Sequence, residues 1–145
     1  LISQAPLHSP YGGVYPNLAK REHQTNLVPL AEQALKEAGL FVPREGIPPV
    51  YEDALTNVRE NLFRESIQHF LESVSTPDID LIAVTHGPGL EPALWTGISF
   101  ATALGSAWGK PVLGIDHMEG HIVSALLKPQ TDADRTQTYA EGDWW

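Results

Sequence analysis

Hydrophobic positions near the start of the chain recur at the spacing of an amphipathic helix. Over residues 17–39, apolar side chains follow an i, i+3, i+4, i+7 pattern, which predicts a helix with Asn17 as its N-cap. Pro29 lies inside this pattern and predicts either a kink or a fresh helix that begins near Asn26. Residues 6–16 are rich in proline and glycine and predict a loop before the helix.

A second helical pattern extends over residues 51–74, after a segment (41–50) whose three prolines predict a connection. Its predicted buried stripe consists of Leu55, Val58, Leu62, Phe63, Ile67, Phe70, Leu71 and Val74.

The pattern changes in the second half, where two short and fully apolar runs (81–84 and 112–115) predict strands buried on both faces. Residues 91–108 between them predict a helix that starts with a proline in its permitted first turn. The helix carries small residues that favour close packing on a sheet: Gly97, Ala101, Ala103 and Gly105. This strand, helix, strand order predicts a right-handed crossover between parallel strands, and hence an α/β fold class.

Two candidate ligand-binding features follow these predicted strands. Gly87-Pro88-Gly89 follows the first strand, and residues 117–121 follow the second. The carboxyl ends of parallel strands share one edge of a sheet, where open α/β folds bind ligands, so the two features are expected to converge. A glycine loop at a helix N-terminus can bind an anionic substrate through backbone amides, although a tight strand-to-helix turn explains the same residues.

His117 and His121 are the candidate metal ligands. In a helix, residues four apart have Cβ atoms roughly 5–6 Å apart, so both rings can reach one cation. A pair of surface or capping histidines is the alternative. Metalloproteases of the His-Glu-x-x-His type place a glutamate directly after the first histidine, and here Met118 occupies that position. The pattern therefore argues against a protease of that type.

Neighbouring residues have both structural and functional interpretations. His86 either reaches the metal from the first strand or is a hydrogen-bonded loop histidine. Asp116 either orients an imidazole or caps the helix that follows. His23 is expected to be a satisfied core or capping histidine. Packing roles are predicted for two tryptophans of the 91–108 helix, Trp95 and Trp108.

Composition restricts the function classes. The 145 residues are 42% hydrophobic and 19% charged, which is typical of a single globular domain, and no apolar run is long enough to cross a membrane. A formal charge of −9 argues against a large nucleic-acid footprint on this segment. The chain has no cysteine and no signal-peptide pattern, so a cytoplasmic location is expected. Residues 1–4 look like the end of a strand, as in an internal piece of a longer protein.

Several motifs together resemble the TsaD (formerly Gcp) family. They are Tyr11-Gly12-Gly13-Val14 with Pro16, Ala19 and His23, Thr85-His86-Gly87-Pro88-Gly89-Leu90, Gly97 in its helix, and His117-Met118-Glu119-Gly120-His121. The resemblance implies a transferase that passes threonylcarbamoyl from threonylcarbamoyl-AMP to N6 of the tRNA adenosine beside the anticodon. It also implies an actin and sugar-kinase-like (ribonuclease H-like) lobe.

The resemblance further implies a cofactor and partners. One divalent metal ion, iron or zinc, is expected on His117 and His121, with an aspartate of a second lobe as the third ligand. TsaB-like and TsaE-like proteins are the expected partners, and other protein surfaces are expected to hold most of the tRNA. The helix over residues 17–39 corresponds to a TsaB-pairing helix, although its apolar stripe is equally compatible with burial in its own lobe.

The resemblance covers residues 1–127, which are expected to be part of an N-terminal lobe, whereas residues 128–145 are an unassigned polar tail. The family's phosphate loop, Ser-Gly-Gly turn and second lobe have no counterpart here, so this segment alone is expected to be inactive. Alternatives are a non-catalytic TsaB-like subunit, which characteristically lacks the histidine pair, and the metalloprotease once associated with the family. A sugar or acetate kinase of the same superfamily finds no support in these residues.

Overall fold

The computed structural model describes residues 5–124 and residue 126, together with their side chains except those of Ala5 and Leu7. The predictions for residues 1–4 and 128–145 lie outside this range. In chain order the elements are α1 (Ala5–His8), η1 (Ser9–Tyr11), α2 (Pro16–Glu37), α3 (Asn61–Ser73), β1 (Ile82–Gly87), α4 (Glu91–Trp108), β2 (Val112–Asp116) and α5 (His117–Ser124).

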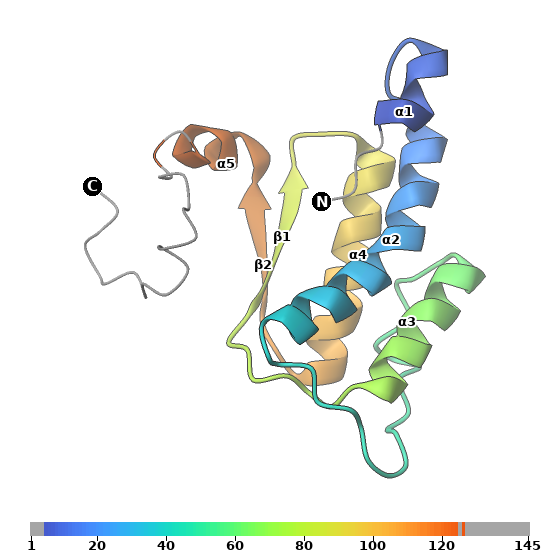
Figure 1. Cartoon of the computed structure of the whole chain (residues 1–145), viewed down its shortest axis with the longest axis vertical. Helices are drawn as coiled ribbons and strands as arrows, with labels where there is room; N and C mark the ends of the chain where they lie inside the picture. Colours follow the sequence, from blue (N-terminus) through green and yellow to red (C-terminus); the bar gives the residue numbers. More distant parts are fainter. Residues whose placement is uncertain (1–4, 125, 127–145) are drawn as a thin grey trace.

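The predicted crossover unit is present. β1 and β2 are parallel and pair from Ile82 with Val112 to Thr85 with Ile115, and α4 has the predicted bounds. α4 packs on the two strands, while α2 and α3 pack on α4 from the side away from the sheet (Figure 1). The result is an α/β arrangement in which the helices lie to one side of a two-stranded sheet.

Glycines allow α4 to approach the sheet closely, as predicted. A Cβ built on Gly97 would lie 3.6 Å from Cγ2 of Val84. At Gly105 the corresponding distance to Cγ2 of Val112 is only 2.4 Å, and the carbonyl oxygen of Lys110 lies at 2.9 Å. The end of α4 therefore packs against the start of β2 in a space that excludes a larger side chain.

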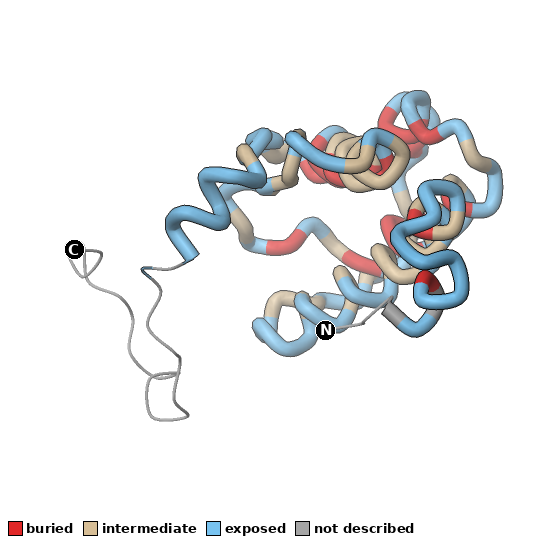
Figure 2. Tube along the Cα trace, turned by 90° about the horizontal axis from the view of Figure 1, so that it is seen from above, coloured by how far each residue is buried: buried red, intermediate tan, exposed pale blue. Residues whose placement is uncertain are grey.

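The hydrophobic core lies between the helices. Its largest fully buried side chains are Leu55, Ile67, Leu71 and Val74. Trp108 has the predicted packing role, because it is buried and its ring meets Phe70 edge-on at 6.1 Å between ring centres. Figure 2 shows the buried positions gathered along the helical part, whereas α5 is exposed along its length.

The prediction that both strands are buried on two faces is wrong. Leu113 is 52% exposed, and Val112 and Ile115 are also exposed. α4 covers one face of the sheet, and no other described element packs on the opposite face. The apolar run was correctly assigned to a strand, but the described part of the chain supplies only one covering layer.

The single helix predicted for residues 51–74 is also wrong. Residues 52–57 form turns, and α3 begins only at Asn61. The Tyr51 hydroxyl donates to the carbonyl oxygen of Leu71 at 3.2 Å, which holds the turn segment against α3. Leu62, placed in the predicted buried stripe, is 80% exposed. The other apolar residues of the stripe do enter one core, but from two separate elements.

Three predictions about the first segment also need correction. α2 continues through Pro29, so no fresh helix begins near Asn26. Its N-cap is Tyr15 rather than Asn17, because Pro16 occupies the first helical position, where its missing N–H costs nothing. The predicted loop 6–16 contains η1 and most of α1.

The apolar side of α2 contributes to the core through partly buried residues, namely Leu27, Val28, Ala31 and Leu35. Two other apolar residues of α2, Leu30 and Ala34, are exposed, so the described residues cover its apolar stripe only in part. Among the described residues, no helix combines the length and apolarity needed to cross a membrane.

Candidate functional site

The ends of β1 and β2 bring the two predicted features to one edge of the sheet. After a register shift beyond Thr85, Gly87 pairs with Asp116, so the loop after β1 and the start of α5 leave the sheet side by side. The backbone of α5 lies close to both strands, beyond their carboxyl ends (Figure 1). The convergence expected from parallel pairing is therefore observed.

α5 places the two candidate metal ligands side by side, with their rings in an edge-to-face arrangement. His117 and His121 are one helical turn apart, and their Nε2 atoms are 3.0 Å apart. The ring centres are separated by 4.5 Å and the ring planes meet at 88°. Both side chains are exposed. In this arrangement one Nε2–H donates to the other Nε2, and two imidazole nitrogens point at a common region of space.

The spacing of these nitrogens is close to that required for a shared metal ion. With metal–nitrogen distances of about 2.0–2.1 Å, a separation of 3.0 Å corresponds to a ligand angle of about 94°. A tetrahedral angle needs about 3.3–3.4 Å, which small side-chain rotations supply. Among the described residues, no group of three or more His, Cys, Asp or Glu side chains could hold a metal ion. Were a metal ion to bind here, the described residues would supply two ligands.

Asp116 has one of its two predicted roles, that of helix cap. Its Oδ1 accepts hydrogen bonds from the backbone N–H groups of Met118 at 2.8 Å and Glu119 at 3.1 Å. These bonds satisfy two of the amides that a helix start leaves free. Asp116 therefore fixes the direction in which α5 leaves β2, and with it the position of His117.

His86 belongs to β1 rather than to the following loop, which corrects the loop-histidine alternative. Its exposed ring lies over the backbone of β2, because a Cβ built on Gly114 would come within 2.6 Å of Cδ2 of His86. His86 is not part of a three-residue ligand group in the described part of the chain.

The Gly87-Pro88-Gly89 loop has the contacts of a tight turn. Gly87 has a φ of +146°, which L residues rarely adopt, and Gly89 lies against the side chain of Leu94. Leu90 then forms the N-cap of α4 without a side-chain capping bond. The positive φ of Gly87 favours a glycine, whereas Gly89 makes only ordinary van der Waals contact with Leu94, and anionic substrate binding by the loop stays a prediction.

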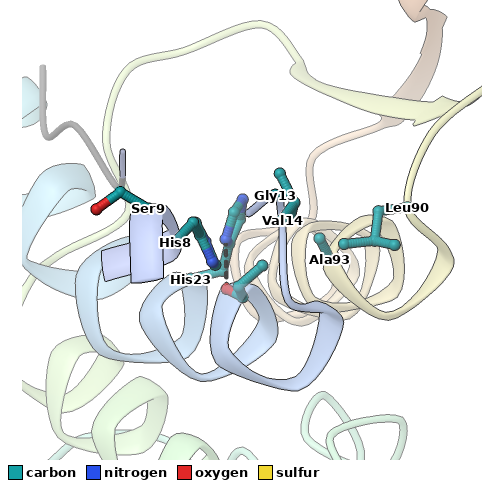
Figure 3. Close-up of a pocket in the computed structure, with 8 residues that line it drawn as sticks. His8, Ser9, Gly13, Val14, His23, Leu90 and Ala93 are labelled. Carbon is teal, nitrogen blue, oxygen red and sulfur yellow. Dashed lines mark hydrogen bonds between the residues drawn. The ribbon is translucent and has the colours of Figure 1, made fainter. Parts of the chain in front are cut away.

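The sequence did not reveal a cavity of about 580 Å³ beside this loop (Figure 3). Its lining consists of His8, Ser9, Gly13, Val14, Ala19, His23, Leu90 and Ala93. The buried His8 accepts a hydrogen bond at Nδ1 from the backbone N–H of Tyr15 at 3.2 Å. His23 donates from Nδ1 to the carbonyl oxygen of Ala19 at 2.7 Å, which confirms the prediction of a satisfied histidine. The sequence feature that could have indicated this cavity is the pair of histidines, His8 and His23, on either side of the Tyr-Gly-Gly-Val motif.

Trp95 lines a second cavity, of about 930 Å³, and is 58% exposed, so its predicted packing role is wrong. Lys20 and Glu60 form an ion pair in the lining. The hydrogen bond from Lys20 lowers the pKa of Glu60, against an opposing effect of partial burial.

Comparison with known proteins gives consistent matches. The family model described as "TsaD: tRNA N6-adenosine threonylcarbamoyltransferase" matches residues 1–44 and 45–142. A protein with the name tRNA N6-adenosine threonylcarbamoyltransferase from Albidiferax ferrireducens is 38% identical over 127 residues, which are 88% of this chain and 26% of the relative. A protein of the same name from Nitrosospira multiformis is 40% identical over 133 residues, 92% of this chain and 28% of the relative. The chain thus spans about a quarter of the length of these curated relatives.

Proposed function

The chain belongs to the TsaD family, and from this premise we propose that it is a part of a tRNA N6-adenosine threonylcarbamoyltransferase. The reaction is transfer of a threonylcarbamoyl group from threonylcarbamoyl-AMP to N6 of the adenosine beside the anticodon. The observation that carries the proposal is the family match along almost the whole chain. The parallel β1–α4–β2 unit is compatible with the actin and sugar-kinase-like lobe that the family resemblance implies.

We assign His117 and His121 as two ligands of one divalent metal ion, iron or zinc. The support is the 3.0 Å approach of their Nε2 atoms on an exposed helix at the carboxyl edge of the sheet. When bound, such an ion supplies Lewis-acid polarisation of the transferred carbamoyl group. The histidines hold it only if both present a lone pair at Nε2, so binding replaces the hydrogen bond between the rings.

The segment by itself is proposed to be inactive. Two neutral imidazoles form an open, low-affinity site, and a carboxylate from outside the described residues has to complete it. We also propose cytoplasmic TsaB-like and TsaE-like partners. Part of the apolar stripe of α2 packs against the core, so we propose that any pairing through α2 uses its exposed face, which includes Leu30 and Ala34.

A metal titration tests the site assignment. Zinc or ferrous iron is added to the 145-residue chain, to a His117→Ala/His121→Ala variant and to a His69→Ala variant, with binding followed by calorimetry. His69 is an exposed histidine on α3 and serves as the matched control. We expect the paired variant to lose the binding seen in the wild-type chain and in the control. Equal affinity in all three proteins contradicts the assignment.

A chimaera tests the function itself. Residues 1–127 replace the matching segment of a full-length relative, and the product is assayed for threonylcarbamoyladenosine in tRNA. Modified tRNA supports the transferase proposal, and its loss in the chimaera with the paired histidine substitution ties activity to the site. A folded chimaera that binds metal but leaves tRNA unmodified contradicts the proposal.

A further inference from the structure

We propose that the turn formed by residues 9–15 is a stacking site for an unpaired base of an RNA loop, with Tyr11 and Tyr15 as its aromatic surface. The inference rests on the proposed function, because it assigns part of the contact with an RNA substrate. We refer to these residues as the tyrosine turn.

The two rings form an exposed aromatic pair. Their centroids are 5.2 Å apart and their planes differ by 28°, which is a stacked arrangement. Tyr11 is 62% exposed and Tyr15 48% exposed, and the intervening Val14 is also exposed. Aromatic rings of this kind recognise the unstacked bases of RNA loops. The pair therefore offers a flat surface to a base.

The backbone holds the tyrosine turn in one shape. Gly12 has a left-handed φ of +69°, and its N–H donates to the carbonyl oxygen of Ser9 at 3.2 Å. The Tyr15 N–H donates to Nδ1 of the buried His8. Pro16 then starts α2 immediately after the second ring. Because the turn is ordered before a ligand arrives, binding requires little further loss of conformational entropy.

The tyrosine turn lies at the same end of the molecule as the candidate metal site. Ser9, Gly13 and Val14 line the 580 Å³ cavity together with Leu90 and Ala93, which directly follow the loop after β1 (Figure 3). α1, the start of α4 and α5 all lie at the end toward which both strands point (Figure 1). A base held here and an adenosine presented to His117 and His121 would both lie at this end of the molecule.

Net charge disfavours phosphate as the contacted group. Eighteen acidic and nine basic residues make phosphate contacts a poor source of affinity for this chain. Base stacking on aromatic side chains needs no counterion release and contributes affinity for any base. Because salt screens the repulsion between an acidic chain and phosphate, RNA contact through the tyrosine turn is expected not to weaken as salt concentration rises.

The test uses fluorescence anisotropy of a labelled RNA hairpin with an unpaired loop, mixed with the 145-residue chain. Tyr11→Ala/Tyr15→Ala is compared with Tyr11→Phe/Tyr15→Phe and with Trp95→Ala, which removes an exposed ring from another surface. We expect the alanine variant to raise the Kd about five- to 150-fold, the range for one lost base stack. The phenylalanine variant and the Trp95 control are expected to remain within about twofold of wild type.

Both alanine substitutions leave the backbone bonds of Gly12 and Tyr15 in place, so circular dichroism should be unchanged. Unchanged affinity in the alanine variant, equal loss in the Trp95 control, or no hairpin binding by the wild-type chain each overturns the inference. A tyrosine-dependent affinity that is equal for a blunt duplex without a loop also overturns it. The proposed transferase is judged separately, by modified nucleoside formed in the chimaera, so the two can fail independently.

Discussion

Replacing Gly105 with alanine is expected to destabilise the chain even though alanine is the better helix former. The added Cβ would lie 2.4 Å from Cγ2 of Val112 and 2.9 Å from the carbonyl oxygen of Lys110. Helix propensity favours the substitution by about 1 kcal/mol. Overpacking typically costs about 1–3 kcal/mol, and the upper part of this range applies because one contact is backbone. The net expectation is a loss of roughly 1–2 kcal/mol in the free energy of unfolding.

Urea unfolding followed by circular dichroism measures this loss. Gly120→Ala in α5 is the matched control, since a Cβ there meets no atom within 4 Å. Its free energy of unfolding is expected to stay unchanged or to rise by up to about 1 kcal/mol. If Gly105→Ala is as stable as wild type, the close approach of α4 to β2 is refuted. The placement of the loop after β1 relative to α5 would then need to be reconsidered.

Three further outcomes are expected. The pKa of Glu60 is lowered in the folded chain. Its ion pair with Lys20 therefore stabilises the folded state fully at pH values above the unfolded-state pKa, and this stabilisation is lost as pH falls through the folded-state pKa. Glu60→Gln should thus cost up to about 1 kcal/mol in urea unfolding at neutral pH and nothing in acid. Asp116→Ala should lower the helicity of α5 and weaken zinc binding, whereas Asp116→Ser retains the cap and both properties. Ile67→Ala should cost about 2–5 kcal/mol of unfolding free energy, and Leu62→Ala less than about 0.5 kcal/mol.

α4 was predictable to the residue because its boundary signals are local. Glu91-Pro92 supplies an acid and a proline in the first turn, and Gly109 adopts the left-handed conformation that ends the helix. The parallel pairing of β1 and β2 followed from the length of the connection. Predicting that the two histidines of α5 lie one turn apart on the same side required only the helical repeat.

The errors arose where tertiary contacts decide the local structure. A helical repeat over residues 51–74 was real, yet the Tyr51 hydroxyl bond to α3 stabilises a turn that brings the same apolar residues into the core. The repeat cannot distinguish one helix from two elements that face a common core. The repeat also placed Leu62 on the buried side of the predicted helix, whereas its side chain is exposed. The tyrosine turn was missed because its shape depends on a bond between His8 and the Tyr15 backbone, seven residues away.

The exposure of β2 connects the fold to the proposed weakness of the metal site. Leu113 and Ile115 alternate with Val112 and Gly114, so they lie on the sheet face away from α4, beside Ala83 and Thr85 of β1. Their apolar character is typical of a strand covered on both faces, and the described residues cover only one.

α5 shares this condition, because its apolar side chains Met118, Ile122 and Val123 are exposed along with its histidines. Covering a side chain of this kind contributes about 1.5–3 kcal/mol, which is not gained here. His117 and His121 therefore stand on a short helix held by one cap and two strands. Part of the free energy of metal binding is therefore used to order that helix, which lowers the affinity. We expect low metal affinity from the segment and higher affinity once a second layer covers the sheet.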